Sequence, residues 1–363
     1  MPVNIAVRVF DTVVSVDLDD SLPVPVRDAI TAQWAHLRVT DAAPDLRMLL
    51  TLPGTETTVE EGLQVVVSQP DSAADQLATR LTLAGLGHLA GTAFLFHAAG
   101  LALDDGRVLA FVGPSGRGKT TIASRLGTTL GYVSDETVAF RRDLSVIPYP
   151  KPLSIGSRPG SKQMHAPAAL GLKPAPDELR LAALVLLDRD PTASASRVEA
   201  VPLDEALGEL VPQMSSLAAM PDPLSNLANV IAETGGVRRL VYAGAENLVD
   251  LVPTILQTRL GAKPVTEPAT LALPDALPRG AVGRAPFVDA LAIDDKLAVL
   301  SGHRLHVLAG IGPILWNGAD GVSIDEMRER VEATHGPNPN AAADSYVANA
   351  IDQLVAAGVL RIG

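Results

Sequence analysis

The segment from Gly113 to Thr120 has the residue types and the spacing needed to hold a chain of phosphates. It reads GPSGRGKT and fits the pattern G-x-x-x-x-G-K-[ST], with an apolar, strand-like stretch before it and a helix-forming stretch after it. Its glycines let backbone N–H groups converge on an anion, Lys119 would reach the β- and γ-phosphates, and the Thr120 hydroxyl would coordinate Mg²⁺. We therefore expect ATP and Mg²⁺ to bind here. The residues expected to contact the nucleotide are Gly113, Pro114, Ser115, Gly116, Arg117, Gly118, Lys119, Thr120 and Thr121.

An acidic pair and a histidine flank this loop at short distances along the chain. Asp135 and Glu136 begin 16 residues after Lys119, and His97 stands 22 residues before it. The short helix predicted from TTIASRLGTTL would return the chain directly to a strand, so that the pair could lie beside the γ-phosphate. Two plainer interpretations stay open: His97 as an ordinary core histidine, and the acidic pair as a solvated turn.

Residues 96–140, FHAAGLALDDGRVLAFVGPSGRGKTTIASRLGTTLGYVSDETVAF, resemble the core of the HPr kinase/phosphorylase family. The resemblance is closest to its related kinases that phosphorylate lasso-peptide precursors. His97, the phosphate loop and the acidic pair match the family pattern in order and in spacing. The resemblance covers roughly residues 75–260 and implies an α/β fold with a P-loop core related to phosphoenolpyruvate carboxykinase.

The resemblance also implies a role for each matching side chain. Asp135 would take the proton from an attacking serine hydroxyl, and His97 would order the acid or the phosphates. Glu136 would help Thr120 hold Mg²⁺. Lys119 would act on the phosphates themselves.

The chain departs from the family just after the acidic pair. The glycine-rich signature of HPr kinases is absent and YPKPLSIGSRPGSKQMH stands in its place, which argues against HPr as substrate and against phosphorylase activity. This loop offers the cations Lys151, Arg158 and Lys162. We expect Lys151 first, and Arg158 second, to neutralise the transferring phosphate, the alternative being a solvated basic loop.

Composition excludes several other classes of protein. The 363 residues include no cysteine, which rules out a disulfide scaffold, a thiolate zinc site, an iron–sulfur cluster and a cysteine nucleophile. The net charge of −12 argues against unspecific binding to nucleic acid or anionic lipid. The first 20 residues carry acids where a signal peptide has a cationic start and an apolar core, so no signal peptide is expected. The uncharged stretch from Leu81 to Leu103 is rich in glycine and is expected to be a buried helix running into a buried strand, so we expect no membrane association and a cytoplasmic protein.

Four segments are expected along the chain. Residues 1–74 alternate like strands around one short helix and predict an α+β module, and 75–262 form the P-loop domain. Residues 263–287 hold five prolines and are expected to be a linker. Residues 288–363 predict two or three short strands, then helices, with Ser323 and Glu326 as a capping box and Asn340 as the cap of the last helix.

This last segment resembles the PqqD family of winged-helix-like domains that bind the leaders of ribosomally made peptides. The strand pair, the stretch from Trp316 to Gly321, the SIDE helix start and the long last helix carry the resemblance. It implies that a peptide pairs with a strand edge near Leu305 to Leu308. A DNA-binding winged helix is disfavoured, because five Lys and Arg face ten Asp and Glu between 288 and 363.

The sequence therefore predicts an ATP-dependent kinase that phosphorylates a hydroxyl, expected to be serine, of a precursor peptide whose leader the C-terminal domain binds. It leaves open whether the chain is a monomer or a homo-oligomer. Two alternatives stay open. One is a kinase of a small molecule or sugar, and the other is an adaptor that binds nucleotide and peptide but transfers nothing.

Overall fold

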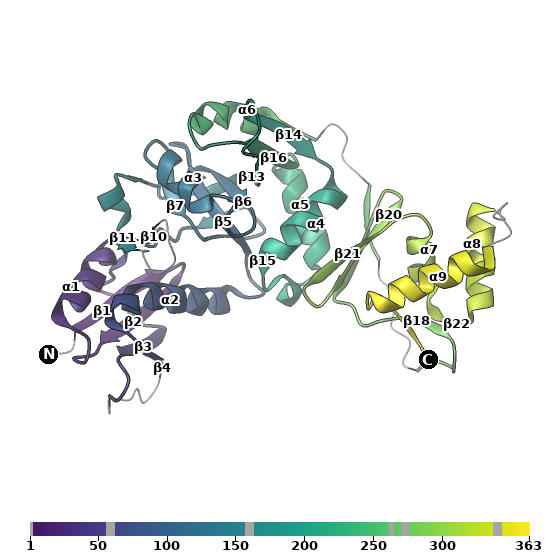
Figure 1. Ribbon diagram of the computed structural model, residues 1–363, viewed down its shortest axis with the longest axis horizontal. Helices are drawn as coiled ribbons and strands as arrows, with labels where there is room; N and C mark the ends of the chain where they lie inside the picture. The colour runs from purple at the N-terminus through teal and green to yellow at the C-terminus, as the bar shows by residue number, and fades with distance from the viewer. Residues whose placement is uncertain (1–2, 56–61, 157–162, 261–264, 270–275, 337–342) are drawn as a thin grey trace. The chain divides into compact units, whose positions relative to one another are not determined.

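A computed structural model describes residues 3–55, 62–156, 163–260, 265–269, 276–336 and 343–363. The protein is a mixed α/β chain, drawn in Figure 1. It divides into two compact units: the first holds 1–200, 213–215 and 238–258, and the second holds 201–212, 216–237 and 259–363. Within the described residues, no helix is both long and apolar enough to cross a bilayer.

A large mixed sheet carries the phosphate loop in the first unit. Its strands run in the order β12-β7-β5-β6-β13-β16-β14, and β5 and β6 form an antiparallel hairpin. The turn between them places Gly106 at φ 82°, a conformation that favours glycine. Strand bounds are β5 Phe94–Ala102, β6 Arg107–Val112, β12 Lys173–Pro174, β13 Arg180–Arg189, β14 Arg197–Val201, β15 Met214–Ser215 and β16 Val237–Tyr242.

The stretch 131–140 was expected to be one strand and is two. β7 (Gly131–Ser134) and β8 (Thr137–Phe140) both pair antiparallel with β5, one along each half of it. Between them the Ser134 Oγ accepts hydrogen bonds from the N–H groups of Glu136 and Thr137, which turns the chain. The acidic pair therefore lies at a break between strands and not inside one.

The N-terminal module shares a hydrophobic core with the P-loop domain. Its sheet, in the order β1-β2-β3-β4, packs beside the long helix α2 (Ala73–Leu89), which also contacts β11. The core contains Phe10, Trp34 and Leu81 together with Leu95 and Tyr149 from beyond the expected boundary at residue 74. The remaining bounds are β1 Val3–Val9, β2 Thr12–Leu18, α1 Val24–Gln33, β3 Leu46–Thr51, β4 Leu63–Val66, β9 Val146–Ile147, β10 Leu153–Ile155, β11 Gln163–His165 and α6 Val252–Gln257.

The second unit is built on the sheet β17-β19-β20-β21 and on β18, which pairs with β22 and β23. The stretch expected to be a linker therefore contains two strands, β17 (Thr266–Pro268) and β18 (Val282–Arg284). Pro268 is tolerated in β17 because this strand lies at the edge of its sheet, where a missing N–H need not break the ladder. The other strands are β19 Asp289–Ile293, β20 Lys296–Ser301, β21 Arg304–Leu308, β22 Asp320–Val322 and β23 Leu360–Ile362.

Helices cover this second sheet from two places in the sequence. α4 (Leu203–Leu210) packs against β21 and α5 (Pro223–Glu233) against β17 and β19, although both were expected in the P-loop domain. The Leu224 N–H donates to the Asp289 carboxylate at 2.8 Å, which ties α5 to β19. From the chain's end come α7 (Gly312–Gly318), α8 (Ile324–His335) and α9 (Ala343–Ala356). The capping box at Ser323 is confirmed, and Asn340 lies outside the described residues.

Candidate functional site

The phosphate loop joins β6 to α3 (Lys119–Leu126) with the backbone that its glycines allow. Gly116 and Gly118 have φ of 85° and 96°, where a side chain would be strained. A Cβ on Gly118 would also lie 2.9 Å from the Tyr242 hydroxyl. That hydroxyl donates to the Arg117 carbonyl, so the end of β16 anchors the loop. Helix α3 begins at once, as the Ile122 N–H bonds to the Gly118 carbonyl at 2.8 Å.

Lys119 is folded back onto its own loop. Its Nζ donates to the carbonyls of Gly113 at 2.5 Å and Pro114 at 3.0 Å. Burial lowers the pKa of Lys119 to about 8, against the opposing pull of the Asp135 and Glu136 carboxylates. The ammonium is thus a cation held in a poorly solvated place. An anion between the loop and the acidic pair would offer it a better partner.

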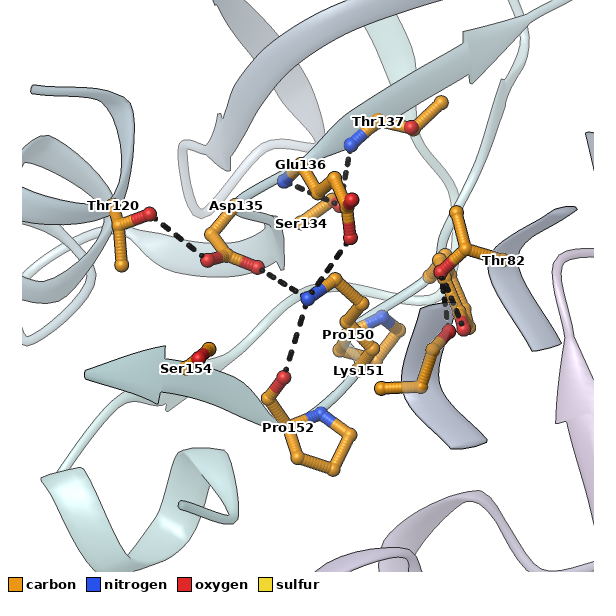
Figure 2. Close-up of polar contacts among 12 residues, drawn as sticks. Thr82, Thr120, Ser134, Asp135, Glu136, Thr137, Pro150, Lys151, Pro152 and Ser154 are labelled. Atoms are coloured by element: carbon orange, nitrogen blue, oxygen red, sulfur yellow. Dashed lines mark hydrogen bonds and ion pairs between the residues drawn. The ribbon is translucent and has the colours of Figure 1, made fainter. Parts of the chain in front are cut away.

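Asp135 is the centre of a hydrogen-bond network, shown in Figure 2. Its Oδ2 accepts from the Thr120 hydroxyl at 3.2 Å, which links the start of α3 to the acidic pair. Its Oδ1 accepts from the buried Tyr132 hydroxyl at 3.2 Å, and that hydroxyl lies 3.0 Å from the Lys151 carbonyl. Both carboxylate oxygens are therefore oriented by neighbours.

Lys151 supplies the positive charge of this cluster. Its side chain is buried, and its Nζ lies 3.3 Å from Asp135 Oδ1 and 3.1 Å from Glu136 Oε2, as Figure 2 shows. Burial alone would lower the pKa of Lys151, but the two carboxylates more than offset it and raise the pKa above its usual value. Lys151 thus stays charged. The other two cations named from the sequence, Arg158 and Lys162, lie outside the described residues.

His97 lies half-buried beside the acidic pair. Its Nδ1 is 3.1 Å from the Glu136 carbonyl, a contact that places a proton on Nδ1. Burial, and then the Lys119 charge, lower the pKa of His97, so the ring is neutral near pH 7. It fixes the backbone at Glu136 and presents its other nitrogen without adding charge.

These side chains line one pocket of about 520 Å³. Loop and α3 residues from Ser115 to Thr121 form the first wall, with Arg189, and the acidic pair, Lys151 and His97 line it too. The remaining lining residues belong to a surface that we call the α2 wall: Asp75, Ala78 and Thr79 of α2 with Ser154 of β10 and Met164 of β11. A second hollow of about 70 Å³ shares Gly118, Thr121 and Arg189 with this pocket and continues past Tyr242 to Ala245.

The oxygen donors present fit Mg²⁺. This ion prefers hard oxygen ligands, takes one or two protein carboxylates, and completes its shell with water and substrate phosphates. The Thr120 hydroxyl and the Asp135 carboxylate already meet at 3.2 Å, and Glu136 is adjacent. Among the described residues, no group of three or more His, Asp and Glu side chains could hold a metal ion, so a metal here would rely on the nucleotide for further ligands.

Several site residues were not singled out from the sequence. Tyr132 orients Asp135, Tyr242 anchors the loop, and the α2 wall closes the pocket from a distant part of the chain. Tyr132 lies only three residues from Asp135 in the same predicted strand segment, a signal that was available. The other two depend on tertiary contacts that no local pattern records.

Comparisons with known proteins do not assign the chain to a family. No family model matches the sequence, and a search of curated proteins found no significant relative. What the site does is therefore argued from its own geometry.

Proposed function

We propose that this protein is an ATP-dependent kinase that phosphorylates a serine hydroxyl of a peptide. One observation carries the proposal: the phosphate loop, the Asp135–Glu136 pair and the buried Lys151 line the same pocket, with Thr120 bonded directly to Asp135. Phosphoryl transfer needs a phosphate cradle, charge neutralisation and a group that orients and deprotonates the acceptor. Each requirement has a side chain here.

The nucleotide phosphates are held by the N–H groups of the loop and by Lys119, which turns away from the Gly113 and Pro114 carbonyls to reach them. The small hollow between Thr121 and Ala245 takes the near part of the nucleoside, because it adjoins the phosphate loop at Gly118 and is not lined by the acidic pair. Thr120 and Glu136 would hold Mg²⁺, which would supply positive charge to the β- and γ-phosphates.

Asp135 is the proton acceptor. Its Oδ1 is occupied by Tyr132 and Lys151, whereas among the described residues its Oδ2 accepts a hydrogen bond only from Thr120. The acceptor oxygen forms a bond to the γ-phosphorus, the bond from that phosphorus to the β,γ-bridging oxygen breaks, and ADP leaves. The hydroxyl proton passes to Asp135 Oδ2. The Lys151 ammonium stabilises the negative charge that develops in the pocket during transfer.

A peptide substrate is supported by the second unit. β21 is an edge strand of its sheet, and Arg304 and Val307 on it are exposed. An extended peptide can add to such an edge through main-chain hydrogen bonds. We propose that the leader binds there, and that tethering to this unit raises the acceptor's effective concentration at the pocket. Hydrogen exchange tests this part, because the β21 amides should become protected when the peptide binds.

The kinase proposal is tested by intact mass spectrometry. The protein is incubated with Mg²⁺, ATP and a library of serine peptides, and a gain of about 80 Da, one phosphate group, is expected on peptide. Asp135→Asn should abolish this gain and keep nucleotide binding within about threefold, because a carboxamide keeps the shape of the side chain but cannot accept the proton.

The matched control is Asp105→Asn, an exposed carboxylate in the β5–β6 turn that should leave transfer unchanged. ATP binding without transfer to any peptide would contradict the kinase and favour an adaptor. Transfer that persists in Asp135→Asn would remove Asp135 from its role.

A further inference from the structure

The α2 wall is the part of the pocket that nucleotide binding leaves unexplained. The contacts run in series from one helix to the other: Thr120 of α3 bonds to Asp135, and Asp135 pairs with Lys151. Two residues earlier in the chain, the Tyr149 hydroxyl lies 3.2 Å from the Thr82 hydroxyl of α2. Figure 2 shows the acidic pair and Lys151 between Thr120 and Thr82. The start of α3 and the helix α2 therefore both connect to the carboxylate–lysine cluster, through different residues.

In-line transfer requires the attacking oxygen and the leaving ADP to lie on opposite sides of the γ-phosphorus. ADP is held by the loop and by the start of α3. The acceptor must then approach past other lining residues of the pocket, and those that neither the nucleotide nor the acidic cluster uses are those of the α2 wall.

The chemistry of the α2 wall differs from that of the nucleotide side. Lys119, Lys151 and Arg189 bring positive charge to the pocket. The wall itself holds one carboxylate, Asp75, with the hydroxyls of Thr79 and Ser154 and the apolar side chains of Ala78 and Met164. The Ser154 hydroxyl donates to Asp75 Oδ1 at 3.3 Å and orients the carboxylate at an exposed position.

We propose that the α2 wall is the acceptor subsite and that Asp75 selects a peptide carrying lysine or arginine next to the phosphorylated serine. This inference rests on the kinase function proposed above and adds the place and the charge of the substrate. A carboxylate on the wall attracts a cationic neighbour and repels an acidic one. The short apolar surface of Ala78 and Met164 accommodates the methylene stem of such a side chain.

The first test uses the absence of cysteine from the chain. Thr79→Cys introduces a single thiol on the α2 wall, and Arg80→Cys introduces one at the next, exposed position, which does not line the pocket. Each variant is labelled with a bulky maleimide. Labelled Thr79→Cys should lose at least about tenfold in peptide phosphorylation and keep ATP binding, as expected when the acceptor cannot reach the in-line position. Labelled Arg80→Cys should keep both.

The second test measures charge preference with serine peptides that carry lysine, alanine or glutamate at each position around the serine. The wild-type protein should favour lysine at one position next to serine, and Asp75→Asn should reduce that preference by about fivefold, the effect of removing one partly exposed ion pair. Asp75→Lys should invert it in favour of glutamate. Asp71→Asn, an exposed acid at the start of the same helical segment, is the control.

The outcomes separate the two proposals. Transfer without a lysine preference, or with a preference unchanged in Asp75→Asn, overturns the role of Asp75. Full transfer by labelled Thr79→Cys overturns the acceptor subsite and leaves the kinase in place. A wild-type protein that binds ATP and phosphorylates no peptide overturns the kinase and the subsite together.

Discussion

The Lys151 ammonium lies 3.3 Å from the Asp135 carboxylate, and both side chains are buried. A buried lysine is unfavourable without a partner, and so is a buried carboxylate. Lys151 also pairs with Glu136, whereas Lys151 is the cation that faces the buried Asp135 carboxylate. Removal of Lys151 therefore leaves a buried carboxylate without its cation.

This relationship predicts a large loss of stability in Lys151→Met. Breaking a buried pair by removal of one partner costs about 3–5 kcal/mol, so the free energy of unfolding should fall by roughly this amount. The double variant Lys151→Met with Asp135→Asn should recover at least half of the loss, since the orphaned charge is then gone. Urea denaturation measures both. Equal stability of the single and double variants would mean that the pair contributes little.

Lys119→Met should weaken ATP binding about a hundredfold while the fold persists. A charge-assisted hydrogen bond to phosphate contributes about 1.5–3 kcal/mol, and within the described part of the chain the lysine donates to the loop carbonyls of Gly113 and Pro114. The control is Lys173→Met, which removes an exposed ion pair with Asp104 far along the sheet edge. Titration with a fluorescent ATP analogue reports the affinity. An affinity change below fivefold would argue against a nucleotide at this loop.

Gly118→Ala should weaken ATP binding, because it strains the backbone of the phosphate loop. Its φ of 96° disfavours any side chain by about 1 kcal/mol, and the added Cβ would meet the Tyr242 hydroxyl that anchors the loop. Gly87→Ala is the matched control, because Gly87 lies in α2 with open space around it and should gain about 0.5–1 kcal/mol. Calorimetry and ATP titration of both variants check this, and equal behaviour of the two would contradict it.

Two helix starts allow a paired test of capping in Ser323→Ala and Ser72→Ala. Ser323 accepts from the Glu326 N–H in a full capping box, so its loss should cost about 1 kcal/mol. Ser72 stands at the N-cap of α2 without a side-chain cap bond, so its loss should cost less than half as much. Thermal unfolding of the two variants decides the order. A larger effect at Ser72 would be inconsistent with the geometry.

Local patterns predicted the parts of the site that local physics determines. The strand before residues 113–120, the helix after them and the Ser323 capping box depend on residues within a few positions of one another, and all lie where expected. The break at Asp135 was missed because it depends on the pairing of two short strands with one long partner.

Long-range packing could not be predicted from the sequence for the same reason. α4 and α5 have clear apolar faces, but nothing in their own residues says which sheet they cover, so they were placed with the wrong domain. Lys151 was predicted as a phosphate-neutralising cation. Its burial between two carboxylates depends on the turn at Ser134, and no residue near Lys151 in the sequence predicts that turn.

The shared core around Tyr149 bears on how this protein can be shortened or recombined. Tyr149 packs against Phe10 and Trp34, with ring centroids 4.4 and 6.5 Å apart, and it stands two residues before Lys151. We therefore expect that the segment carrying the phosphate loop does not fold without the N-terminal module. A chain that begins at residue 75 would lose Phe10 and Trp34, the apolar partners of Tyr149 beside Lys151. Any shortened version for crystallography, or any transfer onto another scaffold, therefore has to include the first sheet.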